Sequence, residues 1–182
     1  MTSLVEKIVI VHETLANANL PHAFGGALAL AWCTERARGT IDIDVNVFVP
    51  VSDYEQVMQQ LPADVRITRK DRALFRKEGQ VRLWWDKTPL DLFLNSTDYH
   101  DQVSGRVRWE QFGGTTLPFL CCDDLAVFKA FFNRTKDWAD LEAMQAAGTL
   151  DLGEIISTIS LYMGNDDERV GKLRALASLD SD

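Results

Sequence analysis

Two aspartates, Asp42 and Asp44, stand in a run of alternating apolar and polar residues. Every second residue of 41–49 is isoleucine or valine, which predicts a half-buried strand whose apolar residues face one way. Both acids, with Asn46, then face the other way, and their Cα atoms lie about 7 Å apart. Because magnesium prefers oxygen ligands, two carboxylates on one rigid edge predict a magnesium site.

A third acid and a pair of glycines extend this hypothesis. Asp91 lies in the stretch PLDLFL (89–94), a second predicted strand. Its carboxylate would complete a site for two ions about 3.5 to 4 Å apart, which bind the attacking and leaving oxygens in phosphoryl transfer. Gly25 and Gly26 are predicted at a strand-to-helix turn, where backbone N–H groups can approach phosphate oxygens.

The elements that must position these residues follow from the apolar periodicity. Helices are predicted over 3–18, after Gly26, over 52–61 with Ser52 and Glu55 as a capping box, and from Asp123 to the end. Strands are predicted over 22–24, 41–49, 66–68, 73–77, 81–85, 89–94 and 114–117.

This order of elements predicts an α+β fold, with a twisted mixed sheet flanked by helices and followed by a C-terminal helical part. Residues 1–117 would form the catalytic domain, and residues 118–182 would form a helical region packed on it. The chain contains no internal repeat and no low-complexity linker that would separate the two parts.

Composition favours a cytoplasmic protein. The 182 residues contain no apolar run near the roughly 18 needed to span a bilayer, so no membrane partner is expected. Cys33, Cys121 and Cys122 have no metal-ligand spacing and are predicted to be reduced packing residues. One of the adjacent Trp84 and Trp85 is expected to pack in the core, and the other could stack on a base.

The net charge of -8 disfavours broad binding to nucleic acid. One segment is nevertheless basic, with a single acid, Asp71, among its cations. It would either guide an anionic partner or form a solvated edge. Its cations are Arg66, Arg69, Lys70, Arg72, Arg76 and Lys77.

Several motifs together resemble the DNA polymerase beta nucleotidyltransferase superfamily. They are GGALA (25–29), Arg38-x-Thr40-x-Asp42-x-Asp44 and LDLF (90–93). The second motif narrows the resemblance to toxins of the abortive-infection type, found in type IV toxin–antitoxin systems, and to small aminoglycoside nucleotidyltransferases. LPFLCCDDLAVFKA (117–130) and RTKDWADL (134–141) also look like the toxin-type C-terminal motif, so the resemblance covers about residues 22–145.

The resemblance implies a nucleotidyltransferase fold, two Mg²⁺ ions as cofactor and a nucleoside triphosphate as substrate. Asp42 and Asp44 would bind the metal, and Asp91 would be the third ligand or the base that activates the acceptor hydroxyl. Gly26 stands where many members have a phosphate-binding serine, so the backbone of Gly25 and Gly26 would have to supply the donors.

The remaining site residues also come from the resemblance. Arg38 and Thr40 would position the strand or touch phosphate, and Lys129 would neutralise triphosphate charge. Lys136 and Asp137 match the second half of the motif, in which Asp137 would orient Lys129 or contact the acceptor. Asp140, in the same half, would be an exposed helix acid or have a direct role, and we favour the exposed acid.

The acceptor is left open between two classes. Toxin-like relatives imply an RNA end, such as that of transfer RNA, together with a cognate antitoxin, and we favour this class. Antibiotic-modifying relatives imply a cationic aminoglycoside, which the acidic net charge would suit. A third hypothesis is a nucleotide-binding module that performs no chemistry.

Overall fold

The structure is a computed structural model that describes residues 2–36 and 39–178. The chain divides into two compact units, one made of residues 1–28 and 39–120 and the other of residues 29–38 and 121–182. Residues 29–38, which were expected in the catalytic domain, are thus grouped with the C-terminal helices. The packing of one part on the other stays a prediction.

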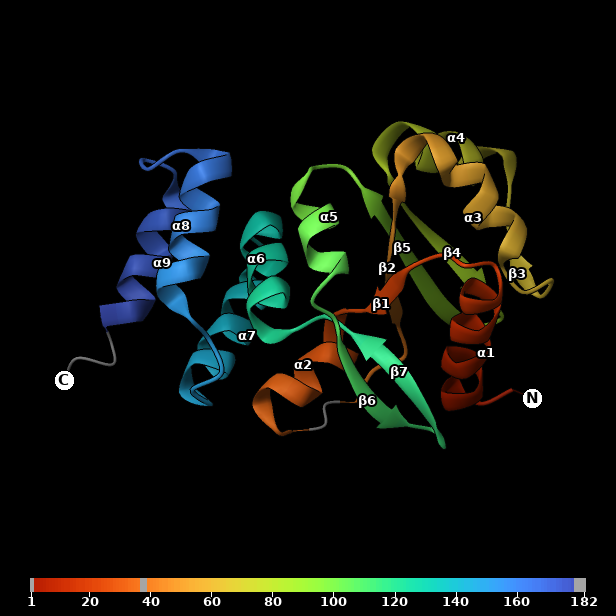
Figure 1. Cartoon of the computed structure of the whole chain (residues 1–182), viewed down its shortest axis with the longest axis horizontal. Coiled ribbons are helices and arrows are strands. Elements are labelled where there is room, and N and C mark those ends of the chain that lie inside the picture. Colours follow the sequence, from red (N-terminus) through yellow and green to blue (C-terminus); the bar gives the residue numbers. More distant parts are fainter. Residues whose placement is uncertain (1, 37–38, 179–182) are drawn as a thin grey trace. The chain divides into compact units, whose positions relative to one another are not determined.

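The first unit contains a mixed seven-stranded sheet in the order β3-β4-β5-β2-β1-β7-β6 (Figure 1). β2 runs parallel to β5, and β1 runs parallel to β7, while the other neighbouring pairs are antiparallel. The predicted α+β class is therefore confirmed. The strands are β1 His22–Phe24, β2 Ile43–Pro50, β3 Val65–Arg66, β4 Gln80–Trp85, β5 Thr88–Asn95, β6 Arg108–Phe112 and β7 Thr115–Phe119.

Helix α1, Leu4–Asn17, confirms the first predicted helix and is fixed to the sheet by a buried lysine. Ser3 and Glu6 form a capping box that satisfies its first amides. The Lys7 ammonium donates to the Trp85 carbonyl at 2.9 Å and to the Thr88 hydroxyl at 3.1 Å. These bonds hold the hairpin of β4 and β5, whose strands carry part of the acidic site.

The segment after β3 is helical, which corrects the strands predicted over 66–68 and 73–77. Only Val65–Arg66 is a strand, and α4 spans Arg69–Glu78. Thr68 and Asp71 form a capping box at its start, and Gly79 ends it with a φ of 66°. These end signals outweigh the β-like apolar triplet in the middle of the segment.

Two further expectations about the sheet and its helices are wrong. Ile41 lies outside β2 and is 68% exposed, while Asn46 is buried, so the half-buried pattern does not extend over 41–49. Helix α3, Tyr54–Gln60, follows a short 3-10 turn over Val51–Asp53. Ser52 donates to Asp53 and does not cap α3. Helix α5, Tyr99–Ser104, and strand β6 were not predicted from the sequence.

The second unit is helical and contains a disulfide. Cys33, on helix α2 (Gly26–Thr34), is bonded to Cys122 at the start of α6. The expectation of three reduced cysteines is therefore wrong for Cys33 and Cys122, and Cys121 keeps its thiol. The unit's other helices are α6 Cys122–Phe132, α7 Thr135–Ala146, α8 Leu152–Met163 and α9 Glu168–Ser178. No helix within the described ranges combines the length and apolar character required to cross a membrane.

Candidate active site

Three aspartates lie on, or directly before, two neighbouring parallel strands of the first unit. Asp44 of β2 is the register partner of Asp91 of β5. Directly paired residues point to the same face of a sheet, so the two carboxylates stand side by side. Asp42 precedes the first residue of β2 and is two positions from Asp44, which places it on the same side. The residues predicted to carry the chemistry are thus brought together.

Thr40 and Gly25 fix the backbone around these acids. The Thr40 hydroxyl accepts a hydrogen bond from the Asp42 amide at 3.1 Å and donates to the Asp42 carbonyl at 3.3 Å. The Gly25 amide donates to the Asp44 carbonyl at 2.9 Å. Thr40 therefore positions the strand, one of its two predicted roles, while Arg38 lies outside the described residues.

Gly26 is required by the closeness of Asp44. A Cβ at Gly26 would lie 1.9 Å from Oδ2 of Asp44. The backbone φ of Gly26 is 52°, a value that residues with a side chain rarely adopt. Gly26 is also the first residue of α2, whose free amides carry partial positive charge. The turn thus presents backbone donors beside a carboxylate.

Arg82, which the sequence reading missed, joins two of the three acids. Its Nε and Nη2 donate to the two carboxylate oxygens of Asp91 at 2.8 and 2.6 Å, and Nη2 also reaches Oδ2 of Asp42 at 3.3 Å. Hydrogen bonding to Asp91, reinforced by the charges of the three acids, raises the pKa of the Arg82 guanidinium above its ordinary value. A fixed cation therefore balances part of the negative charge.

The position of Arg82 could have been derived from the hairpin. In β4, residues alternate between exposed and buried, and Arg82 is on the exposed face. A two-residue turn at Asp86 and Lys87 pairs Trp85 with Thr88 and, three steps further, Arg82 with Asp91. Asp86 has the φ of 53° that such a turn requires. The register was therefore readable from the turn length.

The donors fit magnesium in type, although they are not gathered around a common point. Three carboxylates supply hard oxygen ligands. Within the described ranges, however, no set of three or more acids, histidines or cysteines is arranged to hold a metal ion as it stands. The guanidinium of Arg82 lies between two of the donors instead.

Lys129 lies in the second unit within a buried acidic cluster. Its ammonium is 2.7 Å from Oδ2 of Asp140 and 3.8 Å from Oδ1 of Asp137. Asp137 in turn accepts bonds from the backbone and guanidinium of Arg134. Asp140 is 5% exposed, so its assignment as an exposed acid is wrong, and it is the direct partner of Lys129. Lys136 is exposed in the first turn of α7.

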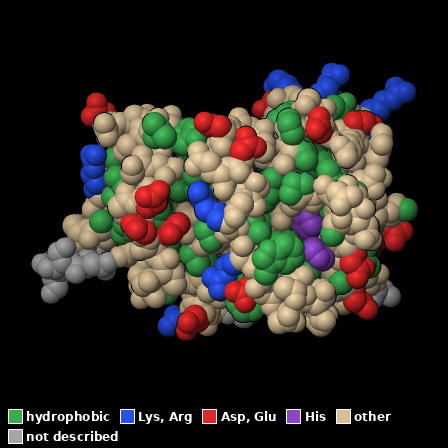
Figure 2. Space-filling model, in the orientation of Figure 1, with side chains coloured by type: hydrophobic (Ala, Val, Ile, Leu, Met, Phe, Trp, Pro, Cys, Tyr) green, Lys and Arg blue, Asp and Glu red, His purple; other side chains and the backbone are tan. Residues whose placement is uncertain are grey.

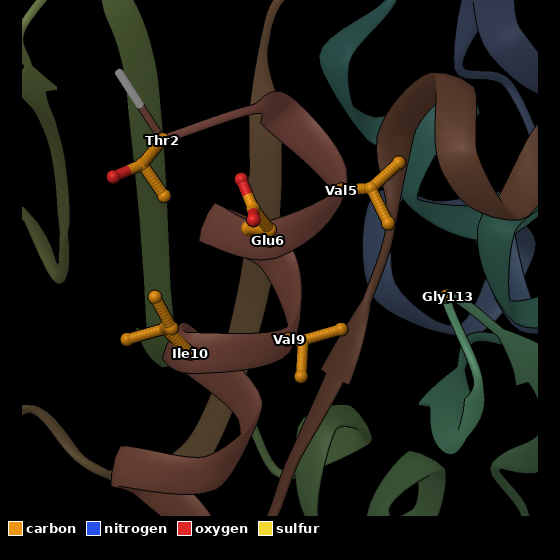
Figure 3. A pocket seen from close by; sticks show the side chains of 6 residues that line it. All are labelled: Thr2, Val5, Glu6, Val9, Ile10 and Gly113. Atoms are coloured by element: carbon orange, nitrogen blue, oxygen red, sulfur yellow. The ribbon is translucent and has the colours of Figure 1, made fainter.

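A pocket of about 530 Å³ lies away from these acids, along α1 of the first unit. It is lined by Thr2, by residues of α1 and by Gly113 of the turn between β6 and β7 (Figure 3). Its one titratable residue, Glu6, belongs to the capping box of α1. The carboxylate of the pocket is therefore engaged in capping the helix.

Comparison with solved structures identifies the fold. The chain resembles an antigenic nucleotidyltransferase-like protein from Paracoccidioides brasiliensis, with a TM-score of 0.52 and 13% identity over 94% of this chain and 92% of that one. It also resembles the antibiotic-resistance factor ANT(2'')-Ia, with a TM-score of 0.53 and 16% identity over 97% and 92% of the two chains. The fold is therefore nucleotidyltransferase-like. No family model matches the sequence, and no curated protein matches it significantly.

Proposed function

We propose that this chain is a magnesium-dependent nucleotidyltransferase, which transfers a nucleoside monophosphate from a triphosphate to a hydroxyl group and releases pyrophosphate. The observation that carries this proposal is the pairing of Asp44 with Asp91 beside Asp42, with Gly26 held against Asp44. The fold shared with two nucleotidyltransferase-like structures supports the same reaction class.

Each site residue has a role in this reaction. Asp42, Asp44 and Asp91 would hold magnesium, which supplies electrostatic stabilisation of the transferring phosphoryl group. Asp91 would be the third ligand or would accept the proton of the attacking hydroxyl. The Gly25 amide is already bonded to the Asp44 carbonyl, so the amide of Gly26 at the start of α2 would donate to phosphate oxygens. Lys129, held by Asp140, would neutralise triphosphate charge.

Transfer of a labelled nucleotide tests the reaction class. Each α-labelled triphosphate is incubated with magnesium and total RNA, and then with aminoglycosides. We expect Asp44→Asn to lower the rate of nucleotide transfer by at least about 100-fold, because the neutral amide of asparagine cannot replace the negative charge with which Asp44 would hold magnesium. Asp64→Asn, which changes an exposed acid of the same unit, should retain activity. Transfer that survives in Asp44→Asn would overturn the metal-centred mechanism, and no transfer by wild type would favour a non-catalytic module.

RNA is the acceptor class that the surface of α4 favours. Residues 69, 70, 76 and 77 fall within roughly 120° of one another on a helix, which makes one basic face. All four side chains are exposed. Lys and Arg side chains project where Figure 1 places α4 (Figure 2). Arg72 is excluded from this face, because it is paired with Glu55 of α3 at 2.5 Å.

A triple variant tests this acceptor class. Replacing Arg69, Lys70 and Arg76 by alanine should weaken RNA binding similarly for different sequences. For each cation that no longer neutralises a phosphate, the slope of log affinity against log salt should also flatten by about 0.7 to 0.9. Unchanged RNA binding and modification would mean that the helix is only a solvated edge.

A second candidate acceptor is an aminoglycoside. Two observations favour this alternative. The chain is structurally similar to an antibiotic-resistance factor, and its net charge is -8. The same triple variant would then use the cationic acceptor equally well or better, because repulsion falls. Under this alternative, wild type would modify aminoglycosides and leave RNA unlabelled.

A further inference from the structure

Trp84 is an exposed tryptophan that the fold leaves unengaged. It lies on β4, and 47% of its surface is exposed, whereas its neighbour Trp85 is 3% exposed and packs in the core. Within the described ranges, the side chain of Trp84 makes no hydrogen bond, ring contact or cation contact. A large aromatic face is thus offered to solvent without contributing to the core.

Arg66 stands directly beside this ring. It is the antiparallel register partner of Trp84, so both side chains project from the same face with Cβ atoms about 5 Å apart. Arg66 is exposed and forms no ion pair with any described residue. An aromatic ring and an adjacent free guanidinium are the combination that binds a base and its phosphate.

The pair lies on the same sheet face as the acids. Trp84 is two residues from Arg82 along β4, a distance of about 7 Å between Cα atoms. Arg82 in turn contacts Asp91. A nucleotide stacked on Trp84 would therefore lie close to the aspartates, at a distance comparable to the spacing of two residues along a strand, about 7 Å.

We propose that Trp84 and Arg66 form a binding subsite for an unpaired nucleotide of a single-stranded polynucleotide, with the base on the indole and a phosphate on the guanidinium. This inference rests on the proposed function, because the bound polynucleotide would be the acceptor of the transferred nucleotide. An aminoglycoside is not expected to bind here. Arg66 would repel a polycation, and an aminoglycoside has no aromatic ring that could stack on Trp84.

Binding without chemistry tests the subsite. A fluorescently labelled single-stranded oligoribonucleotide of about ten nucleotides is titrated by anisotropy in EDTA without any triphosphate, and its duplex form serves as competitor. Trp84→Ala should weaken binding about 5- to 100-fold, since stacking is worth about 1 to 3 kcal/mol per base, and Trp84→Phe should recover part of the loss. Arg66→Gln should weaken it several-fold and flatten the salt dependence by about 0.7.

Trp109→Ala is the matched control, because it removes an exposed indole of the same unit that already contacts His12. It should bind like wild type, and the duplex should compete poorly. Equal binding by wild type and Trp84→Ala, or equal competition by the duplex, would overturn the proposal. Binding that depends on Trp84, without nucleotide transfer, would support the subsite and contradict the proposed enzyme activity. Nucleotide transfer, without binding that depends on Trp84, would support the enzyme activity and contradict the subsite.

Discussion

At the scale of single residues, Gly26 occupies a position of the candidate site that has no room for a side chain. Gly26→Ala places a Cβ 1.9 Å from Oδ2 of Asp44, so the carboxylate must move or the turn must open. We expect loss of transfer and a fall of about 1 to 2 kcal/mol in the free energy of unfolding, because alanine also disfavours the positive φ. Activity and urea unfolding measure both effects.

Gly105→Ala provides the control for that change. Gly105 ends α5 with a φ of -82°, and an added Cβ would meet only the Gln102 carbonyl oxygen, at 3.8 Å. This variant should keep both stability and transfer. A Gly26→Ala protein that remains fully active would show that Asp44 is not held in place by the glycine.

Arg82 should limit the affinity of the acids for divalent cations. Arg82→Met removes the charge between Asp42 and Asp91 while keeping a long side chain. We expect affinity for Mn²⁺, measured by electron paramagnetic resonance without nucleotide, to rise about tenfold, because one competing positive charge is removed. Arg76→Met, on exposed α4, should leave it unchanged, and an equal or weaker affinity in Arg82→Met would contradict the prediction.

The sequence indicated the three acids that the structure brings together, but it did not indicate Arg82, the cation that pairs with two of them. Asp42, Asp44 and Asp91 could be found because alternation and apolar flanks mark strand residues without tertiary information. Arg82 required the register of a hairpin, which depends on recognising the turn at Asp86. The burial of Asp140 depends on contacts between helices, and these are not encoded in local periodicity.

At the scale of elements, strand β1 carries a histidine that should make stability depend on pH. Nδ1 of His22 lies 2.8 Å from the Leu20 carbonyl oxygen, and its Nε2 lies 2.9 Å from Nδ1 of His12. Burial lowers the pKa of His22 to about 4, with a smaller opposing effect from the Leu20 carbonyl.

The sign of this effect follows from the depressed pKa. Between pH 6.5 and about 4 the unfolded chain binds a proton that folded His22 does not, so stability is lost as pH falls through this range. From pH 7 to pH 5, wild type should lose about 2 kcal/mol more than His22→Asn, whose amide can still donate to Leu20. Urea unfolding at both values measures the difference, and parallel losses in the two proteins would contradict it.

Element boundaries were predictable where end signals and periodicity agree, as in α1. They failed at α4, where Ala73, Leu74 and Phe75 suggested a strand. The capping box of Thr68 and Asp71 and the left-handed Gly79 were present in the sequence and would have identified the helix. Strand β6 was missed because its residues alternate only between intermediate and exposed positions.

At the scale of the whole molecule, the bond between Cys33 and Cys122 should contribute substantially to stability. The two residues are 89 positions apart, and closing a loop of this length removes about 4 to 5 kcal/mol of unfolded-chain entropy as an upper value. The Cys33→Ala, Cys122→Ala double variant, or wild type in a dithiol reductant, should therefore melt at a lower temperature. The pairing of Cys33 with Cys122 could not be predicted from the positions of the cysteines in the sequence, because the two residues are far apart along the chain.

Cys121→Ser is the control, because a hydroxyl can still donate to Asp124 as the Cys121 thiol does. Its melting temperature should stay close to that of wild type and fall equally on reduction. An identical melting temperature for oxidised and reduced wild type would contradict a stabilising role for the bond.

The same bond makes residues 33–122 a covalently closed ring, which contains all three aspartates and the basic face of α4. A protease that cuts once after an exposed arginine or lysine of α4 would open this ring without releasing a fragment. The nicked protein should migrate as one species of unchanged mass, apart from an added water, under denaturing conditions without reductant. It should separate into two pieces only when the disulfide is reduced.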